Sequence, residues 1–172
     1  MSTLSLFTET SETRILSTDS QNTPRDLAID LGWFDLDPCS NPDSHILARR
    51  TCSLENGQDG LADLWTIDGT RDTAPASVFC NGNYSDPLPW CERLAQHSAP
   101  WAALWKLDPT TEWFRELTEA RSQVWWAPFR KRLKFERAGN CGSADFPSVL
   151  VWRRWQPSKA VLARLLAPRS EA

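Results

Sequence analysis

The chain has 172 residues, enough for one domain with a buried core and too few for two domains of ordinary size. Its composition, with 41% hydrophobic and 24% charged residues, is typical of a globular protein, and no stretch reaches the roughly 20 apolar residues that a membrane span requires. The N-terminus has neither the basic start nor the apolar centre of a secretion signal, so we expect a soluble, cytoplasmic protein without a membrane partner.

Cysteine and tryptophan usage narrows the possible classes of site. The five cysteines form no Cys-x-x-Cys pair, which fits neither a disulfide framework nor a standard zinc site. We therefore expect free thiols and no metal ion. The ten tryptophans recur inside apolar runs such as WAALWKL, so most of them are expected in the core.

The net charge of −3 conceals an uneven distribution of charge along the chain. Residues 1–68 contain 4 basic and 12 acidic residues, whereas residues 101–172 contain 13 basic and 7 acidic residues. Within the basic part, the sequence RKRLKFER at 130–137 has five cations against one glutamate. Such a cluster is a candidate for contact with nucleic-acid phosphates, but a solvated edge strand protected by charges would have the same sequence.

The N-terminal segment is predicted to be an arm that precedes a single domain. Residues 1–20 are rich in Ser, Thr and Glu, and we expect them to be loosely ordered, with the domain spanning 21–172. A helix is predicted over 24–31, because the hydroxyl of Thr23 can cap it and Pro24 suits its first turn.

The first strand is predicted at WFDLD, residues 33–37. The alternation places Phe34 and Leu36 on one side of the strand, and Pro38 ends it. A short helix is then expected over 42–51.

The rest of the chain alternates between short apolar runs and helical patterns. We predict a turn at 59–65, a strand at 78–80, a helix at 90–97, a strand at 101–107, a helix at 108–120 capped by Asp108, strands at 123–129, 132–136 and 148–154 with a loop at 139–143, and a closing helix at 157–167. This order predicts an α/β fold with an open sheet, mostly parallel with an antiparallel C-terminal edge.

Three polar motifs follow predicted strands, namely DLDP, NGNY and KLDP. Because the carboxyl ends of parallel strands share one rim, where open α/β sheets bind ligands, we expect the three motifs at one site. The stretch VFCNGNY, from residue 78 to 84, is the most informative, since an apolar strand stops at two amides and an aromatic ring. A plain turn explains Asn-Gly-Asn equally well.

Taken in order, the motifs resemble those of the phage Dam-like DNA adenine methyltransferases, which transfer a methyl group to an exocyclic amino group. The resemblance covers about residues 23–154 and rests on Thr23-Pro24, Leu36-Asp37-Pro38-Cys39, Asp59-Gly60-Leu61 with Trp65, Asn81-Gly82-Asn83-Tyr84-Ser85, Arg132-Leu133-Lys134-Phe135 and Pro147-Ser148. Gly82 and Asn83 stand where the family has two prolines, which would stiffen the loop.

The resemblance implies a Rossmann-like methyltransferase sheet, S-adenosylmethionine as cofactor and DNA as partner. Adenine's amino nitrogen is a poor nucleophile, and the family chemistry implies that the side-chain oxygen of Asn81 and the carbonyl of Gly82 accept its hydrogens. Asn83 adds a polar contact or a turn, and Tyr84 stacks on the extruded base. If the loop is merely loose, proline at 82 and 83 should raise the rate.

The resemblance also assigns the other binding residues. The cofactor would lie against Thr23, Pro24, Asp37, Pro38, Cys39 and Asp59. DNA would contact Ser85, Arg130, Lys131, Arg132 and Lys134. Helix capping and turn formation are alternative explanations for Thr23, Pro24 and the two aspartates.

Two other functions are compatible with these motifs. A catalytically inactive DNA-binding protein on a methyltransferase scaffold, acting in anti-restriction or regulation, would keep the basic cluster without needing Asn81. Transfer to the amino group of cytosine would use the same acceptors. The resemblance further implies a phage or prophage origin and a bacterial cytoplasm as the site of action.

Overall fold

The computed structural model describes residues 22–119, 123–137, 140–166 and 169–170. The arm predicted over residues 1–20 lies outside these ranges. Strands in the described part are, in chain order, β1 (Trp33–Asp37), β2 (Leu47–Thr51), β3 (Val78–Cys80), β4 (Trp101–Lys106), β5 (Val124–Pro128), β6 (Lys134–Arg137), β7 (Asn140–Ser143), β8 (Ser148–Arg153) and β9 (Arg169–Ser170). The helices are α1 (Arg25–Leu31), α2 (Leu88–Gln96), α3 (Glu112–Glu119), α4 (Lys159–Arg164) and the short 3₁₀ helix η2 (Leu54–Asn56).

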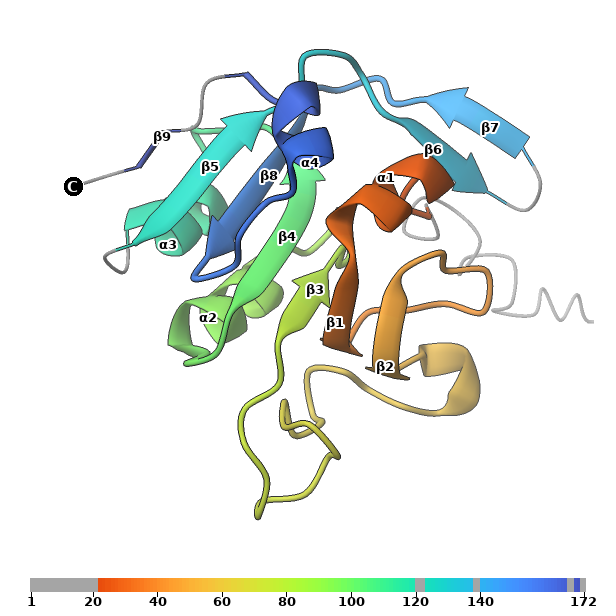
Figure 1. Ribbon diagram of the computed structural model, residues 1–172, viewed down its shortest axis with the longest axis vertical. Helices are drawn as coiled ribbons and strands as arrows, with labels where there is room; N and C mark the ends of the chain where they lie inside the picture. Colours follow the sequence, from red (N-terminus) through yellow and green to blue (C-terminus); the bar gives the residue numbers. More distant parts are fainter. Residues whose placement is uncertain (1–21, 120–122, 138–139, 167–168, 171–172) are drawn as a thin grey trace, which may run out of the picture.

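Within the described residues, the main sheet has seven strands in the order β2-β1-β3-β4-β8-β5-β9 (Figure 1). The pairs from β2 to β4 are parallel, and β8 lies antiparallel between β4 and β5. Five strands therefore run in one direction, while β8 and the edge strand β9 run in the other. The predicted α/β class, with a mostly parallel sheet and antiparallel C-terminal strands, is confirmed.

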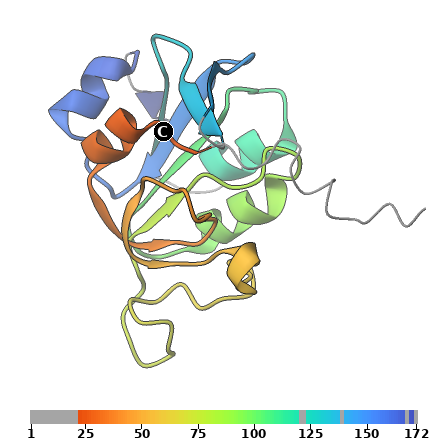
Figure 2. The ribbon, with the colours of Figure 1, turned by 90° about the vertical axis from the view of Figure 1, so that its right-hand side faces the viewer.

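Helices cover both faces of the sheet. Figure 2 shows α1 and α4 against one face and α2 and α3 against the other. The burial of apolar side chains agrees, because one core cluster contains the inward faces of α2 and α3 and a second contains those of α1 and α4. Since apolar layers lie on both sides, the central strands β3 and β4 are almost fully buried, as the continuous apolar run at 101–107 predicts.

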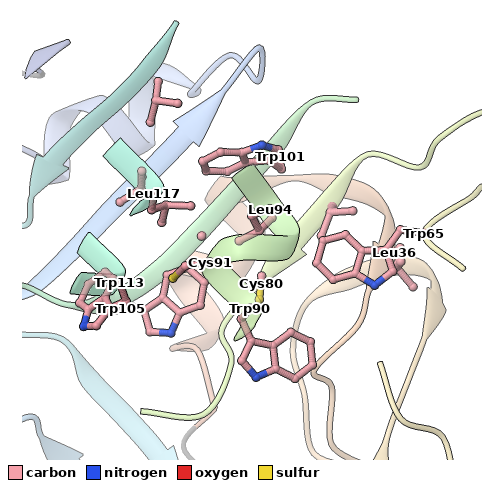
Figure 3. Packing of buried hydrophobic residues seen from close by; sticks show 14 of the residues in the cluster. Leu36, Trp65, Cys80, Trp90, Cys91, Leu94, Trp101, Trp105, Trp113 and Leu117 are labelled. Carbon is pink, nitrogen blue, oxygen red and sulfur yellow. The ribbon is translucent and has the colours of Figure 1, made fainter. Parts of the chain in front are cut away.

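Tryptophan dominates the core between the sheet and helices α2 and α3 (Figure 3). The indole side chains that are more than nine-tenths buried belong to Trp65, Trp90, Trp101, Trp105, Trp113 and Trp152. The prediction that most tryptophans are in the core is therefore confirmed. Trp126 and Trp155 are partly buried, whereas Trp33 and Trp125 have 64% and 42% of their surface exposed.

Strand β1 departs from simple alternation. The amides of Asp35 and Leu36 both donate to the carbonyl of Ser77, each at 3.0 Å, which is the pattern of a bulge with one extra residue. As a result Phe34 packs against Phe79 in the cluster of α1 and α4, whereas Leu36 enters the opposite cluster. The prediction that Phe34 and Leu36 share one side is wrong.

The helix predicted over 42–51 is also wrong, because residues 47–51 form β2 at the edge of the sheet. They pair in parallel with β1, from Trp33 opposite Leu47 to Asp37 opposite Thr51. The hydrogen-bond ladder with β1 is a non-local interaction that outweighs the helix preference of the segment Leu-Ala-Arg-Arg.

Two later boundaries differ from the predictions. Helix α3 begins at Glu112, and the carboxylate of Asp108 instead accepts hydrogen bonds from the amide and hydroxyl of Thr110 in the preceding turn. The loop predicted at 139–143 contains β7, which pairs with β6 in a separate two-stranded sheet. Among the residues that the structure describes, none of the helices is long and apolar enough to cross a bilayer.

Candidate functional site

The candidate site lies where the strand order changes direction. From β1 the chain continues to β2 on one side and later to β3 on the other, so the carboxyl ends of β1 and β3 flank the switch point of the sheet. β1 ends at Asp37, and β3 ends at Cys80, one residue before Asn81. The tertiary structure thus brings the first and second polar motifs to one rim.

Contacts from different parts of the chain hold Asn81 in place. Its Nδ2 donates to the hydroxyl of Thr23 at 3.2 Å, and its Oδ1 accepts from the hydroxyl of Tyr84 at 3.0 Å. Its backbone amide donates to Sγ of Cys39 at 3.1 Å. Thr23 is therefore not the cap of α1, whose N-cap position is Pro24 without a side-chain hydrogen bond, and the predicted capping role is wrong.

Asp37 is the buried acidic group of the site, with 3% of its surface exposed. Its carboxylate accepts from the amide of Cys39 at 3.3 Å and from the hydroxyl of Ser44 at 3.4 Å. Burial raises the pKa of Asp37 from 3.8 to about 6, and these hydrogen bonds offset only part of that rise. The carboxyl therefore stays protonated to a higher pH than that of a free aspartate.

Asp37→Asn should raise the free energy of unfolding at pH 7 by about 3 kcal/mol, because a rise in pKa from 3.8 to about 6 corresponds to a net cost of that size for ionising the carboxyl in the folded protein. The folded protein binds this proton more tightly than the unfolded chain, so stability should fall as the pH rises from about 4 to 6. The variant should lose this dependence. Urea unfolding of both proteins across this range measures it, and an unchanged slope in Asp37→Asn would contradict the assignment.

The sulfur atoms of Cys39 and Cys80 also meet at this point, at 3.5 Å. Burial raises the pKa of Cys39 well above its ordinary value, with the neighbouring Cys80 and Asp37 adding to the effect. The thiol of Cys39 is thus kept protonated, and its sulfur accepts the amide of Asn81. The prediction of free thiols is confirmed for Cys39, Cys52, Cys80 and Cys91.

The structure explains why glycine is present at position 82. A Cβ atom added to Gly82 would lie 2.9 Å from Cγ and Cδ1 of the Trp90 ring. Trp90 is 7% exposed and belongs to the core, so its ring has little freedom to move. Close contact with Trp90 therefore leaves no room for a side chain at this position, and Asn83, which is partly exposed, follows it in the loop.

Tyr84 does not present an open ring at the rim. Its ring lies against Phe146 and Phe135, with centroid separations of 5.3 and 6.1 Å. Burial and the nearby thiols of Cys39 and Cys80 raise the pKa of Tyr84, so its hydroxyl stays protonated and able to donate to Asn81. Ser85 is exposed beside it.

Asp59 does not enter the cluster around Asn81. It is exposed, and its carboxylate accepts the amide of Leu61 at 2.9 Å, which is the alternative role of starting a turn. The turn is nevertheless anchored near the site, because an added Cβ at Gly60 would lie 1.6 Å from the carbonyl oxygen of Pro38. Pro38 is buried, and it contacts this turn through its backbone.

The four predicted basic residues come together in a cavity of about 540 Å³ between α1, α4 and the segment 129–134. Arg164 also lines it, but its guanidinium is paired with Asp26 and Asp30, so its charge is offset. The cavity is lined by Pro24, Phe129, Leu133, Glu136 and the cations Arg130, Lys131, Arg132 and Lys134, among others.

The basic cavity and the Asn81 site share a wall. The backbones of Asn22 and Glu136 exchange hydrogen bonds of 2.8 and 3.2 Å. Asn22 lines the space beside Asn81, whereas Glu136 lines the basic cavity. The two sites are therefore neighbours, joined by a contact between Asn22 and Glu136, which lie about 110 residues apart in the sequence.

Comparison with known proteins found no match to a family model, a curated protein or a solved structure.

Some residues of the site carried no signal in the sequence. Asn41 donates to the side chain of Asn22, and Ser44 reaches the carboxylate of Asp37, so the loop after β1 closes over the switch point. Isolated Asn and Ser residues in a loop are too common to be selected from one sequence. Phe146 precedes the Pro147-Ser148 motif, which is the one feature that could have drawn attention to it.

Proposed function

We propose that the protein is a DNA methyltransferase that acts on the exocyclic amino group of adenine and belongs with the phage Dam-like enzymes. The observation that carries this proposal is the position of the Asn81 amide at the carboxyl end of β3, beside buried Asp37 at the end of β1. The mostly parallel sheet with antiparallel C-terminal strands supports it, because the resemblance implies this arrangement.

The polar groups at the switch point fit S-adenosylmethionine in chemistry. The Thr23 hydroxyl and the Asp37 carboxyl could meet the ammonium and hydroxyl groups of such a cofactor. The space that they enclose is about 20 Å³, which is room for one water molecule. Binding therefore requires the loop that carries Cys39 and Ser44 to move outward. When bound, the cofactor supplies an electrophilic methyl group.

The chain's own residues then act on the base. Oδ1 of Asn81 accepts a hydrogen bond from one amino hydrogen of adenine in place of the one from the Tyr84 hydroxyl. The carbonyl of Gly82 accepts a hydrogen bond from the other amino hydrogen. Both acceptors would stabilise the positive charge that develops on the nitrogen as the methyl group passes to it from the sulfonium sulfur, which would leave as a neutral thioether, and the extra amino proton would leave to solvent. The partly exposed rings of Tyr84 and Phe146 would supply an apolar surface for a base that has left the helix, and the buried ring of Phe135 packs against both.

The basic cavity is proposed to hold the DNA backbone next to this site. Lys131→Gln with Lys134→Gln should weaken binding to duplexes of any sequence and reduce the slope of log K against log salt by nearly two, since each lost phosphate contact contributes about 0.9. Fluorescence anisotropy over a salt series measures the slope.

A matched control removes two charges elsewhere. Arg71 is exposed in the segment before β3, and Arg115 is exposed on α3, which lies on the other face of the sheet. Arg71→Gln with Arg115→Gln changes the net charge equally and should leave the slope close to that of the unaltered protein. Equal slopes for both double variants would mean that the basic cluster is a solvated surface that does not contact phosphates.

The proposed reaction is tested by incubating the protein with S-adenosylmethionine and unmodified duplex DNA, digesting the DNA and analysing the nucleosides by mass spectrometry. Methylated adenine is the expected product. Methylated cytosine alone would mean that the same acceptors act on the amino group of cytosine and not of adenine. No methylated base, with cofactor and DNA both bound, would overturn the proposed activity.

An inactive DNA-binding protein on this scaffold is the second candidate. It is favoured by the hydroxyl of Tyr84, which already occupies Oδ1 of Asn81, and by the small space at the switch point. The two functions differ in cofactor binding. S-adenosylmethionine well above its dissociation constant must raise the melting temperature of an enzyme that binds it, and it leaves the second candidate unchanged.

A further inference from the structure

A separate cavity of about 450 Å³ lies between the start of β5, the end of β8 and α4. It is at the opposite rim of the sheet from Asn81, because Arg154, which follows β8, forms a bridge with Trp101, the first residue of β4. Its volume is within the range of small-molecule sites. None of the residues assigned to the proposed reaction lines it.

Aromatic rings form one part of this cavity. The indoles of Trp125, Trp152 and Trp155 line it. Trp152 is buried, and Trp155 stacks on Phe34 at 5.8 Å, so these two rings are already covered on one side. Trp125 is 42% exposed and therefore offers a ring face on which a planar ligand can stack.

The polar residues of the lining are Arg154, Gln123 and Gln156, and no acidic residue is among the described lining residues. Arg154 donates one hydrogen bond to the carbonyl of Ser98 at 3.0 Å, which leaves further donors of its guanidinium for a ligand. The cavity therefore offers a cation and amides together with an aromatic face.

The backbone gives independent support for a binding role. Gln123 and Arg154 have φ angles of 73° and 55°, and they are the non-glycine residues with positive φ in the described part of the chain. Both line this cavity. Non-glycine residues in this conformation persist where the surrounding structure fixes them, and they gather at binding sites.

We propose that this cavity binds a nucleobase that carries a phosphate, as a mononucleotide or as part of a single strand. The base stacks on Trp125, the glutamine carboxamides hydrogen-bond to its edge, and Arg154 contacts the phosphate. A base inside a duplex is excluded, because both of its faces are already stacked. This binding goes beyond the proposed methyl transfer and does not depend on it.

The test uses the full chain, with deoxyadenosine monophosphate and a short single-stranded oligonucleotide as probes in calorimetric titrations. Arg154→Gly removes the guanidinium and places glycine where φ is positive, so the fold should be retained. Arg154→Gly and Trp125→Ala should each weaken binding about tenfold. Trp33→Ala, which removes an exposed indole outside the cavity, is the matched control and should leave affinity unchanged.

The titrations distinguish a mononucleotide from a single strand as the ligand, and they also show whether the cavity binds a nucleobase at all. Comparable affinity for both probes indicates a mononucleotide, and much tighter binding of the oligonucleotide that both variants weaken indicates a single strand. The proposal is overturned if neither probe binds, or if Arg154→Gly and Trp125→Ala bind as the unaltered protein does. None of these readouts involves methyl transfer.

Discussion

Asn81→Ala should lower the rate of methyl transfer to adenine by at least about 10²- to 10³-fold, while binding of S-adenosylmethionine changes little. The amide oxygen is the acceptor that stabilises charge developing on the amino nitrogen, so its loss affects the transition state more than the bound cofactor. The measurement is single-turnover formation of methyladenine, with cofactor affinity determined separately by calorimetry. Equal loss of rate and of cofactor affinity would contradict the catalytic role of Asn81.

Tyr84→Phe is the matched control for this variant. It keeps the ring that packs on Phe135 and Phe146 but removes the hydroxyl that donates to Oδ1 of Asn81. Because this hydroxyl competes with the base for the same oxygen, we expect the rate of Tyr84→Phe to stay the same or to rise. A loss as large as that of Asn81→Ala would mean that the tyrosine hydroxyl, and not the amide, contacts the base.

Gly82→Ala should destabilise the fold by about 1–3 kcal/mol, the usual cost of adding a methyl group to a packed core. The new Cβ would meet the Trp90 ring at 2.9 Å, closer than such contacts allow. Urea unfolding measures the change. Asn83→Ala, at the next loop position, is the control and should change stability by less than about 0.5 kcal/mol, as most substitutions outside the core do.

A double-mutant cycle assigns the cost of Gly82→Ala to Trp90. In a Trp90→Leu background the ring is absent, so the alanine should cost much less, with a coupling of at least about 1 kcal/mol. An unchanged cost would mean that backbone conformation, and not the ring, selects glycine. Proline at 82 places its own Cβ in the same position, so the structure changes the expectation that proline would raise the rate.

The basic cavity contains a motif that can be recognised in the sequence, but the shape of the surface around that motif cannot be predicted from the sequence. The charge of RKRLKFER is visible in the sequence, and it predicts a phosphate-contacting surface without saying whether that surface is flat or concave. The contact of this segment with α1 and α4 makes the cavity, and the pairing of Arg164 with Asp26 and Asp30 removes a further cation from it.

The sequence by itself determined the elements that depend on local periodicity. The apolar runs at 78–80 and 101–107, and the amphipathic helices after them, follow from side-chain spacing and turn residues within a few positions, and so do the polar motifs at the ends of the strands. These features were sufficient to predict the α/β class and the rim on which Asp37 and Asn81 lie.

Only the tertiary structure decided the features that join distant residues. Residues 47–51 pair with β1 as a strand and do not form the predicted helix. The bulge in β1 opposite Ser77 turns Phe34 and Leu36 to opposite faces of the sheet. The contacts of Asn81 with Thr23, and of Gly82 with Trp90, also arise from segments with no common local pattern. Such interactions form when the sheet brings its strands together, so their geometry is a property of the packed fold and not of any short stretch of sequence.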